Sequence, residues 1–322
     1  MAGRPLFTSV ASTKGHRPHM EDEFFLSADG SFSAVYDGHG GPNVSKYLRR
    51  NLYKHVMENL PPGADVYDVK TVERALQAAF KSADDYVVTQ TPYGNEGSCA
   101  VAVTVHCDRD GKASLIACNL GDSSRAVLSR GGKALDLTED HKPNAPREME
   151  RIYRHDGMVT WEGFECSQGL QIEGTGVYRI NGNLAVARAI GDVDYRPWVS
   201  AEAEIRTIEI KRETDQFVIL ASDGLWDVMT SEEAVDYVHA VMAAAMGSDG
   251  EREKWGGSEG SGGIEDGTHM TLVNWTQSYA EDRGMIRAAT MLRKKKMARY
   301  LTAEALRRGS MDNTTVAIVW LQ

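Results

Sequence analysis

The chain has 322 residues, of which 42% are hydrophobic and 25% are charged, and its formal charge is −10 at pH 7. This composition is ordinary for a folded protein, and the length allows a large hydrophobic core without cross-links. The acidic balance argues against nucleic-acid binding, which needs a basic surface. No stretch is long and apolar enough to cross a bilayer, so we expect no membrane insertion.

The cysteines do not indicate a disulfide framework or a metal site. Cys99, Cys107, Cys118 and Cys166 lie apart, without Cys-x-x-Cys or zinc-like spacing. The N-terminal residues also lack an apolar run of signal-peptide length. We therefore expect a monomer in a reducing compartment. The cytoplasm fits this description, and the nucleus would be added if the basic run 293–296 acts as a targeting signal rather than a solvated helix face.

The N-terminal third predicts one strand followed by two helices. A β-type run occupies 32–36, and an amphipathic helix is expected from 44 to 60, where two prolines follow. Apolar side chains recur at every third or fourth position through 71–88, which predicts a second helix with one apolar face.

The middle of the chain is dominated by strand patterns. Runs at 100–105, 114–118 and 125–128 are rich in β-branched and small apolar residues. The last two runs flank Gly121-Asp122, which is typical of a hairpin. The run 217–221 is continuously apolar, so we expect a central strand that is covered on both faces.

Helical patterns return in the C-terminal third. A helix is expected after Thr230, whose side chain would form a capping box with Glu233, and another covers roughly 285–308. A strand at 314–321 ends the chain. Residues 247–267, rich in Gly, Ser and acids, predict a flexible surface insertion.

Strands come in runs, with helices grouped in pairs between them, instead of alternating one for one. This order favours an α+β fold over a parallel α/β fold. We find no internal repeat, and we expect one domain over residues 1–322.

Acidic motifs stand at the ends of several apolar runs. They are Glu21-Asp22, Asp37-Gly38, Gly121-Asp122, Ser222-Asp223 and Asp312-Asn313. Each motif alone is more typical of a turn than of a site. Together they can converge on hard cations, which prefer carboxylate oxygens. Without cations, two carboxylates 4 Å apart would repel by about 4 kcal/mol at an effective dielectric of about 20.

The wording of these motifs resembles the type 2C, metal-dependent (PPM) protein serine/threonine phosphatases. The most specific match is the sequence Asp-Gly-His-Gly-Gly at 37–41. The matching segments follow the family order and cover nearly the whole chain, at 15–22, 35–41, 97–100, 119–125, 140–143, 184–192, 221–227 and 312–315.

The resemblance implies a four-layer α-β-β-α fold, a central antiparallel β-sandwich flanked by pairs of α-helices. It implies a flap near 143–200 beside the site. It also implies a function, the hydrolysis of phosphoserine and phosphothreonine in phosphoprotein substrates. Water activated by two divalent cations, Mg²⁺ or Mn²⁺, would attack the phosphorus directly, without a phosphoenzyme.

The resemblance further implies roles for the metal-ligating residues. Asp37 would bridge the two cations. Glu21 and the carbonyl of Gly38 would complete the coordination of one cation, and Asp223 and Asp312 would complete that of the other.

Four more residues receive implied roles. Asp122 would bind a third, weaker cation, and Asp22 would hold a water of the metal centre. Arg17 would bind the substrate phosphate, because its planar fork matches two phosphoryl oxygens. His39 would protonate the leaving oxygen, which contributes about 10²–10⁴-fold in such reactions. Taken alone, Arg17 would be a surface arginine and His39 a turn residue.

The chain departs from the family pattern in places. Cys99 stands where threonine is usual, which puts an oxidisable thiol near the metal site. The segment 160–176 is longer than usual and lies within the flap, so substrate choice is open to change. Asp192 reads as a structural turn residue, and we assign it no chemistry.

Two rival functions remain on the residues alone. One is a pseudophosphatase, which keeps the fold for binding and has no turnover. The other is a metal-dependent nuclease, against which the acidic charge and the missing basic stripe weigh.

Overall fold

The structure is a computed structural model, and it describes residues 5–62, 67–164, 176–243 and 283–322. The predicted insertion at 247–267 and the middle of the long flap segment lie outside these residues. No helix among the residues described here is long and apolar enough to span a membrane.

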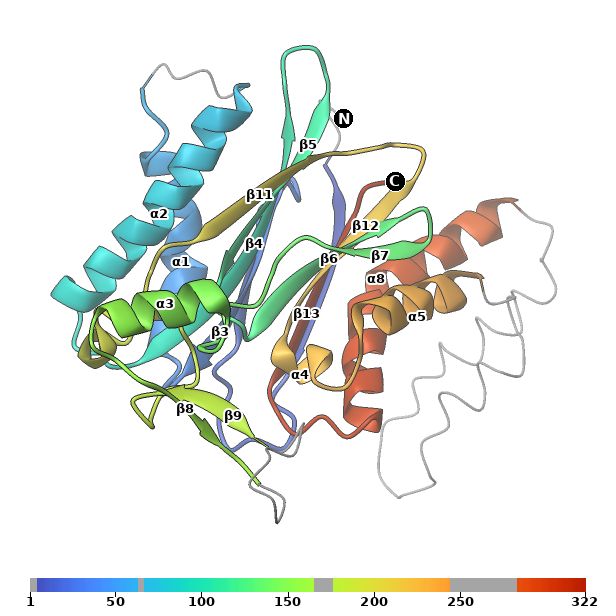
Figure 1. Cartoon of the computed structure of the whole chain (residues 1–322). Coiled ribbons are helices and arrows are strands. Elements are labelled where there is room, and N and C mark those ends of the chain that lie inside the picture. The colour runs from blue at the N-terminus through green and yellow to red at the C-terminus, as the bar shows by residue number, and fades with distance from the viewer. Residues whose placement is uncertain (1–4, 63–66, 165–175, 244–282) are drawn as a thin grey trace.

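Two antiparallel sheets form the centre of the molecule (Figure 1). The five-stranded sheet has the order β1 (Phe7–Thr13), β13 (Thr314–Trp320), β12 (Asp215–Ser222), β6 (Ser124–Arg130) and β7 (Lys133–Asp136). The six-stranded sheet has the order β11 (Glu204–Glu209), β5 (Ala113–Leu120), β4 (Gly97–Cys107), β3 (Phe32–His39) and β2 (Glu23–Leu26), with β10 (Ile190–Gly191) paired to β4. The predicted central strand at 217–221 is confirmed as part of β12.

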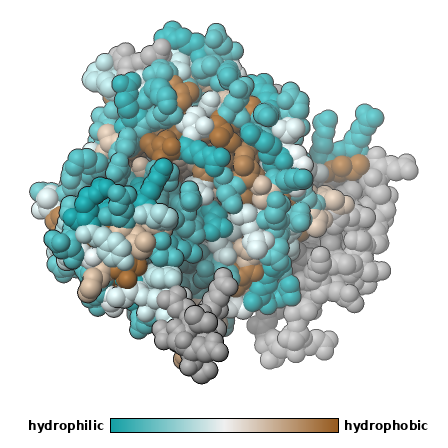
Figure 2. Space-filling model, in the orientation of Figure 1, coloured by the Kyte–Doolittle hydropathy of each residue, from teal (hydrophilic) through white to brown (hydrophobic). Residues whose placement is uncertain are grey.

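Helices cover both outer faces of the sandwich, which confirms the predicted four layers (Figure 1). The helices α1 (Asn43–Glu58) and α2 (Val69–Gln90) pack on the six-stranded sheet. The helices α4 (Asp223–Trp226), α5 (Ser231–Ala243) and α8 (Arg283–Arg307) pack on the five-stranded sheet. Figure 2 shows a mostly hydrophilic face, with hydrophobic side chains gathered over the strands near β11 and β12.

Alternation along the strands builds the core. In β12, Phe217 and Ile219 point toward α5 and α8, whereas Val218 and Leu220 point between the two sheets. Side chains of a strand alternate between its faces, so a run that is apolar at every position fits only a strand buried on both sides. Full burial of each such side chain stabilises the fold by about 1.5–3 kcal/mol.

The predicted capping box begins α5. Thr230 Oγ1 accepts a hydrogen bond from the Glu233 backbone N at 3.2 Å, and the Glu233 carboxylate accepts one from the Thr230 backbone N at 2.9 Å. Two backbone donors of the first turn are thereby satisfied.

The predicted hairpin at Gly121-Asp122 is wrong, because β5 and β6 belong to different sheets. The chain crosses from one sheet to the other at this point. Gly121 has φ +108°, and a Cβ there would collide with the Cys99 side chain. The tight crossing therefore needs glycine, and it carries Asp122 to the end of the sandwich.

A separate hydrophobic cluster supports the flap, which contains α3 (Pro146–Arg154) and the hairpin of β8 (Val159–Glu162) and β9 (Val177–Ile180). Beneath it, the buried Glu148 carboxylate accepts hydrogen bonds from Arg151 and from Arg188 Nε, the latter at 2.9 Å. In Figure 1 this part of the chain lies at the same end of the sandwich as α4.

Candidate metal centre

The acidic motifs meet at one end of the sandwich because the antiparallel registers align the strand ends. Asp37 lies near the end of β3, and Asp223 directly follows β12. Asp312 lies two residues before β13, and Asp22 directly precedes β2. Ser222 Oγ donates to Asp22 Oδ2 at 2.7 Å, which joins the two sheets at this point.

The carboxylates lie close enough to oppose one another's ionisation. Burial first, and then the charges of Asp223, Asp22 and Asp312, raise the pKa of Asp37 well above its ordinary value. Burial raises the pKa of Asp22 to about 6, with smaller contributions from Asp312 and Glu21. Five of the six predicted carboxylates therefore form one electrostatic cluster, which we call the acid centre.

Asp223 and Asp122 extend the acid centre. Burial, followed by Asp227 and Asp312, raises the pKa of Asp223 well above its ordinary value, and Asp122 contributes to the same effect. Burial, followed by Asp140, raises the pKa of Asp122 to about 7. All six predicted carboxylates are thus linked, which agrees with a common site.

Asp227 also belongs to this cluster, although the sequence motifs predict no role for it. Its pKa is raised by burial, and Asp312 and Asp140 add to the effect. The signal was present in the sequence, because Asp227 follows Asp223 by four residues and a helical turn places such residues on one side.

In the described ranges, no group of three or more His, Cys, Asp or Glu side chains is placed to hold a metal ion as it stands. Proximity is what the carboxylates provide, and hard cations also take backbone carbonyls and waters as ligands. A Cβ on Gly38 would lie 2.7 Å from the Glu21 carbonyl oxygen. Only glycine therefore lets the backbone of residue 38 approach the Glu21 segment so closely.

The donors present fit a divalent cation. All are oxygens, as Mg²⁺ and Mn²⁺ prefer. Asp122 Oδ1 is buried and has no hydrogen-bond partner among the described residues. A buried carboxylate oxygen without a partner is costly, and a cation would satisfy it.

Asn313 positions the loop that carries Glu21. Its Oδ1 accepts from the Glu21 backbone N at 2.7 Å, and its Nδ2 donates to the carbonyls of Lys14 and His19 at 2.9 and 3.0 Å. Sequence reasoning missed this role. A side-chain amide next to Asp312 is a weak signal, because its partners lie almost 300 residues away.

Arg17 reaches the acid centre from the loop after β1. Its guanidinium contacts Asp312 Oδ2 at 2.5 Å, and its side chain is 54% exposed. An exposed guanidinium at the rim of an acidic site can turn toward a bound anion without a large desolvation cost. The predicted phosphate-binding residue is therefore at the rim of the site.

His39 is held by Asp192, a residue for which the sequence predicts only a structural turn. Its Nε2 lies 2.7 Å from Asp192 Oδ2, and Asp192 is 2% exposed with φ +51°. A carboxylate on one ring nitrogen fixes the orientation of an imidazole. The left-handed backbone of Asp192 is unusual for a residue other than glycine, which fits a positioning function.

Cys99 lies beside the acid centre, opposite Asp37 in the register of β3 and β4. Burial first, and then the charges of Asp122 and Asp37, raise the pKa of its thiol. The thiol is therefore neutral at physiological pH, and the three described cysteines form no disulfide.

The fold and the site together define a four-layer β-sandwich protein with a cluster of buried carboxylates at one end. The family model "Protein phosphatase 2C" matches residues 8–250, and the chain belongs to this family. Members of the family depend on Mg²⁺ or Mn²⁺.

Curated relatives cover most of this chain. "Probable protein phosphatase 2C 30" of Arabidopsis thaliana is 37% identical over 240 residues, which are 72% of this chain and 56% of the relative. "Protein phosphatase 1A" of Homo sapiens is 35% identical over 258 residues, which are 74% of this chain and 62% of the relative. The chain thus spans less than two thirds of the length of these two relatives.

Solved structures share the fold. A phosphatase from Toxoplasma gondii has a TM-score of 0.63 at 21% identity, covering 98% of this chain and 93% of that one. A Caenorhabditis elegans sex-determining protein has a TM-score of 0.71 at 24% identity, covering 98% of this chain and 65% of that one.

Proposed function

We propose that this chain is an active protein serine/threonine phosphatase that hydrolyses phosphoserine and phosphothreonine in phosphoprotein substrates. The observation that carries the proposal is the acid centre. Asp22, Asp37 and Asp223 come from distant parts of the chain, and burial together with the neighbouring carboxylates, Asp312 among them, raises the pKa of all three. Family membership supports the choice of reaction.

Two cations would be held by the carboxylates already described. Asp37 lies between the two sheets and would bridge both cations. Glu21 and the Gly38 carbonyl would help to hold one cation, and Asp223 and Asp312 would help to hold the other. When bound, such cations polarise phosphoryl oxygens and lower the pKa of water, which makes it a nucleophile at neutral pH.

A third, weaker cation site is proposed at Asp122. The Oδ1 atom without a hydrogen-bond partner among the described residues supports this role, and so does the contribution of Asp122 to the raised pKa of Asp223. Asp22, buried and bonded to Ser222, would accept a hydrogen bond from water at the centre.

Arg17 would bind the phosphoryl group of the substrate. Its guanidinium contacts Asp312 Oδ2, the oxygen that a bound cation would also use. When a cation binds, the guanidinium must therefore turn away from this oxygen. Its five donors then match a phosphate in a two-point contact.

His39 would donate a proton to the leaving serine or threonine oxygen. A seryl alkoxide is a poor leaving group, so the reaction benefits from an acid in a fixed position. Asp192 would keep the ring in that position.

We further propose that residues 1–322 act as one monomeric catalytic domain in the cytoplasm. The common core between the two sheets supports a single folding unit, because β3, β4, β6, β12 and β13 all contribute side chains to it.

Phosphate release from a phosphothreonine peptide, with Mn²⁺ or Mg²⁺ and with excess chelator, tests the proposed function. We expect cation-dependent release by the wild-type chain. Binding of the peptide without release would favour a pseudophosphatase. Nicking of plasmid DNA under the same conditions, with no phosphate release, would favour a nuclease.

A further inference from the structure

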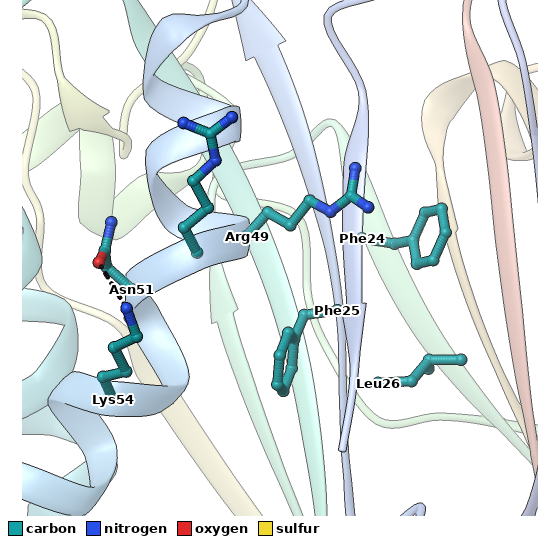
Figure 3. Close-up of a pocket in the computed structure, with 7 residues that line it drawn as sticks. Phe24, Phe25, Leu26, Arg49, Asn51 and Lys54 are labelled. Carbon is teal, nitrogen blue, oxygen red and sulfur yellow. Dashed lines mark hydrogen bonds between the residues drawn. The ribbon is translucent and has the colours of Figure 1, made fainter. Parts of the chain in front are cut away.

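A groove runs between the edge strand β2 and the helix α1, outside the acid centre (Figure 3). Its volume is about 580 Å³. Apolar side chains come from β2, and basic ones come from α1. The main ones are Phe24, Phe25, Leu26, Arg49, Arg50 and Lys54. We call this feature the β2 groove.

The backbone of β2 is open along the groove. Strand β2 pairs only with β3 in the described sheet, and Ser27 N donates to Phe32 O at 2.8 Å just beyond the strand. Hydrogen-bonded pairs alternate in an antiparallel ladder, so the N–H and C=O groups of Phe24 and Leu26 point away from β3. Such an edge can accept another strand.

The two sides of the strand differ in chemistry. Phe24 and Leu26 lie on one side of β2, and Phe25 lies on the side of α1 (Figure 3). Arg49 reaches across the edge, where its guanidinium lies 5.4 Å from the centre of the Phe24 ring and bonds Glu23 Oε2 at 2.6 Å. An added strand would therefore meet apolar groups on one face and α1 on the other.

Arg49 is paired with Glu23, so Arg50 and Lys54 supply the positive charge of the groove, in a chain whose net charge is −10. Arg50 and Lys54 are exposed on α1, and in the described part of the chain Lys54 Nζ donates a hydrogen bond to the neutral Asn51 amide oxygen at 3.5 Å. The residues that line the groove include no carboxylate. An acidic ligand would supply the missing charge.

The open strand edge favours a polypeptide over other anionic ligands. Neither a lipid headgroup nor a nucleic acid can use the alternating N–H and C=O groups of Phe24 and Leu26, whereas an extended peptide can pair with them. Side chains of an added strand alternate between faces. Acidic residues would then face Arg50 and Lys54, and apolar residues would face Phe24 and Leu26.

We propose that the β2 groove docks an extended segment of the phosphoprotein substrate in which acidic and apolar residues alternate. The identity of the ligand as substrate rests on the proposed phosphatase function, whereas peptide docking does not. Strand β2 starts one residue after Asp22 of the acid centre, and its four residues span about 13 Å. The docked segment therefore lies a few residues along the chain from the phosphorylated side chain.

Binding of a fluorescent, non-phosphorylated peptide of alternating Glu and Val tests docking by itself. We expect polarisation to show saturable binding, and Arg50→Glu with Lys54→Glu to weaken it by about tenfold, since two attractive charges become repulsive. A matched control, Arg74→Glu with Lys81→Glu, changes two exposed cations on α2 and is expected to bind as the wild type does. Equal affinity of both double variants would overturn the proposal.

Strand addition has a second, independent readout. N-methylation of the peptide amides that face β2 removes their donors and is expected to abolish binding, whereas N-methylation of the adjacent amides, which face solvent, is not. Equal effects at both sets would overturn strand pairing. Capture of anionic vesicles through Arg50 and Lys54, with no peptide bound, would overturn the choice of ligand.

The link to catalysis is measured with two phosphothreonine peptides, a core peptide and the same peptide extended by the Glu-Val segment. We expect the ratio of their kcat/KM values, extended over core, to fall about tenfold in the Arg50→Glu/Lys54→Glu variant, through KM. An unchanged ratio would overturn substrate docking. If no peptide releases phosphate but the Glu-Val peptide binds, the groove stands and the phosphatase function fails.

Discussion

His39 and Asp192 are the pair of residues at which the geometry says most about the chemistry. Asp192 is buried, its backbone is in the left-handed region, and its Oδ2 lies 2.7 Å from Nε2 of the His39 imidazole. A Cβ on Gly97 would strike both His39 Nε2 and Asp192 Oδ2, so glycine at 97 makes room for the contact. Three separate segments thus cooperate to hold one ring.

Replacement of His39 by alanine is expected to slow hydrolysis of a phosphoserine peptide by about 10²-fold or more. An aryl phosphate, whose phenolate leaves readily without a proton, should be affected far less. Asp192→Asn should show the same selectivity with a smaller loss of activity, because the His39 imidazole remains but loses the carboxylate that orients it. Steady-state kinetics on both substrates measures this. Equal losses on the two substrates would contradict a general acid at His39.

The residues that could be predicted at this scale are those with a local signal. Asp37 and Asp223 stand at the ends of apolar strands, so their place at a sheet edge follows from the sequence pattern. Asp192 and Asn313 gave no such signal. Their functions depend on His39 and Glu21, which lie 153 and 292 residues away in the chain.

At the scale of elements, a buried ion cluster holds α3 against the segment that leads into β10. Glu148 of α3 is 2% exposed, and it bonds Arg151 on its own helix and Arg188 near β10. Although burial alone would raise the pKa of Glu148, the Arg188 and Arg151 guanidinium groups hold it below its ordinary value. The buried charge of Glu148 is therefore compensated by the two guanidinium groups.

Substitution of Glu148 by glutamine should destabilise the flap strongly, because it leaves two partly buried guanidinium groups without their anion. Removal of one partner from a buried ion pair costs about 3–5 kcal/mol. The matched control is Glu150→Gln on the same helix, whose pair with Arg154 is exposed and should matter little. Urea unfolding together with limited proteolysis measures both variants. Similar losses in the two would contradict the assigned role of Glu148.

The elements themselves were largely predictable, and the connection between the sheets was not. The predicted helices at 44–60 and 71–88 correspond to α1 and α2, since amphipathic periodicity is a local property. The local pattern at Gly121-Asp122 predicts a hairpin, because a glycine between two strands is typical of one. Whether two successive strands pair or separate into two sheets depends on distant partners, here β4 for β5 and β12 for β6.

For the whole molecule, the acid centre makes stability depend on pH and cations together. Burial raises the pKa of Asp22 to about 6 and that of Asp122 to about 7, against an ordinary value of 3.8. Between pH 3.8 and these raised pKa values, the folded state binds more protons than the unfolded state. The free energy of unfolding therefore falls as pH rises from about 4 to 7 through these groups.

We expect the chain in excess chelator to become less stable between pH 5 and pH 7.5. His141 acts in the opposite sense, because burial lowers the pKa of its imidazole, but it is one group against several carboxylates. Mg²⁺ should stabilise the protein more at pH 7.5 than at pH 5, since cations bind the ionised form. Urea unfolding at the two pH values measures this. If Mg²⁺ stabilised the protein equally at the two pH values, the claim that cations bind the ionised carboxylates of the acid centre would be wrong.

The most direct test of the central claim is a Mn²⁺ titration of the metal-stripped chain, with cation binding followed by calorimetry and phosphopeptide hydrolysis followed in the same samples. We expect the wild-type chain to bind at least two cations and to gain activity as they bind. Asp37→Asn should lose both properties, whereas the exposed control Asp85→Asn should keep them. If Asp37→Asn bound Mn²⁺ and hydrolysed the peptide as the wild type does, Asp37 would not bridge the cations and the proposed metal centre would be wrong.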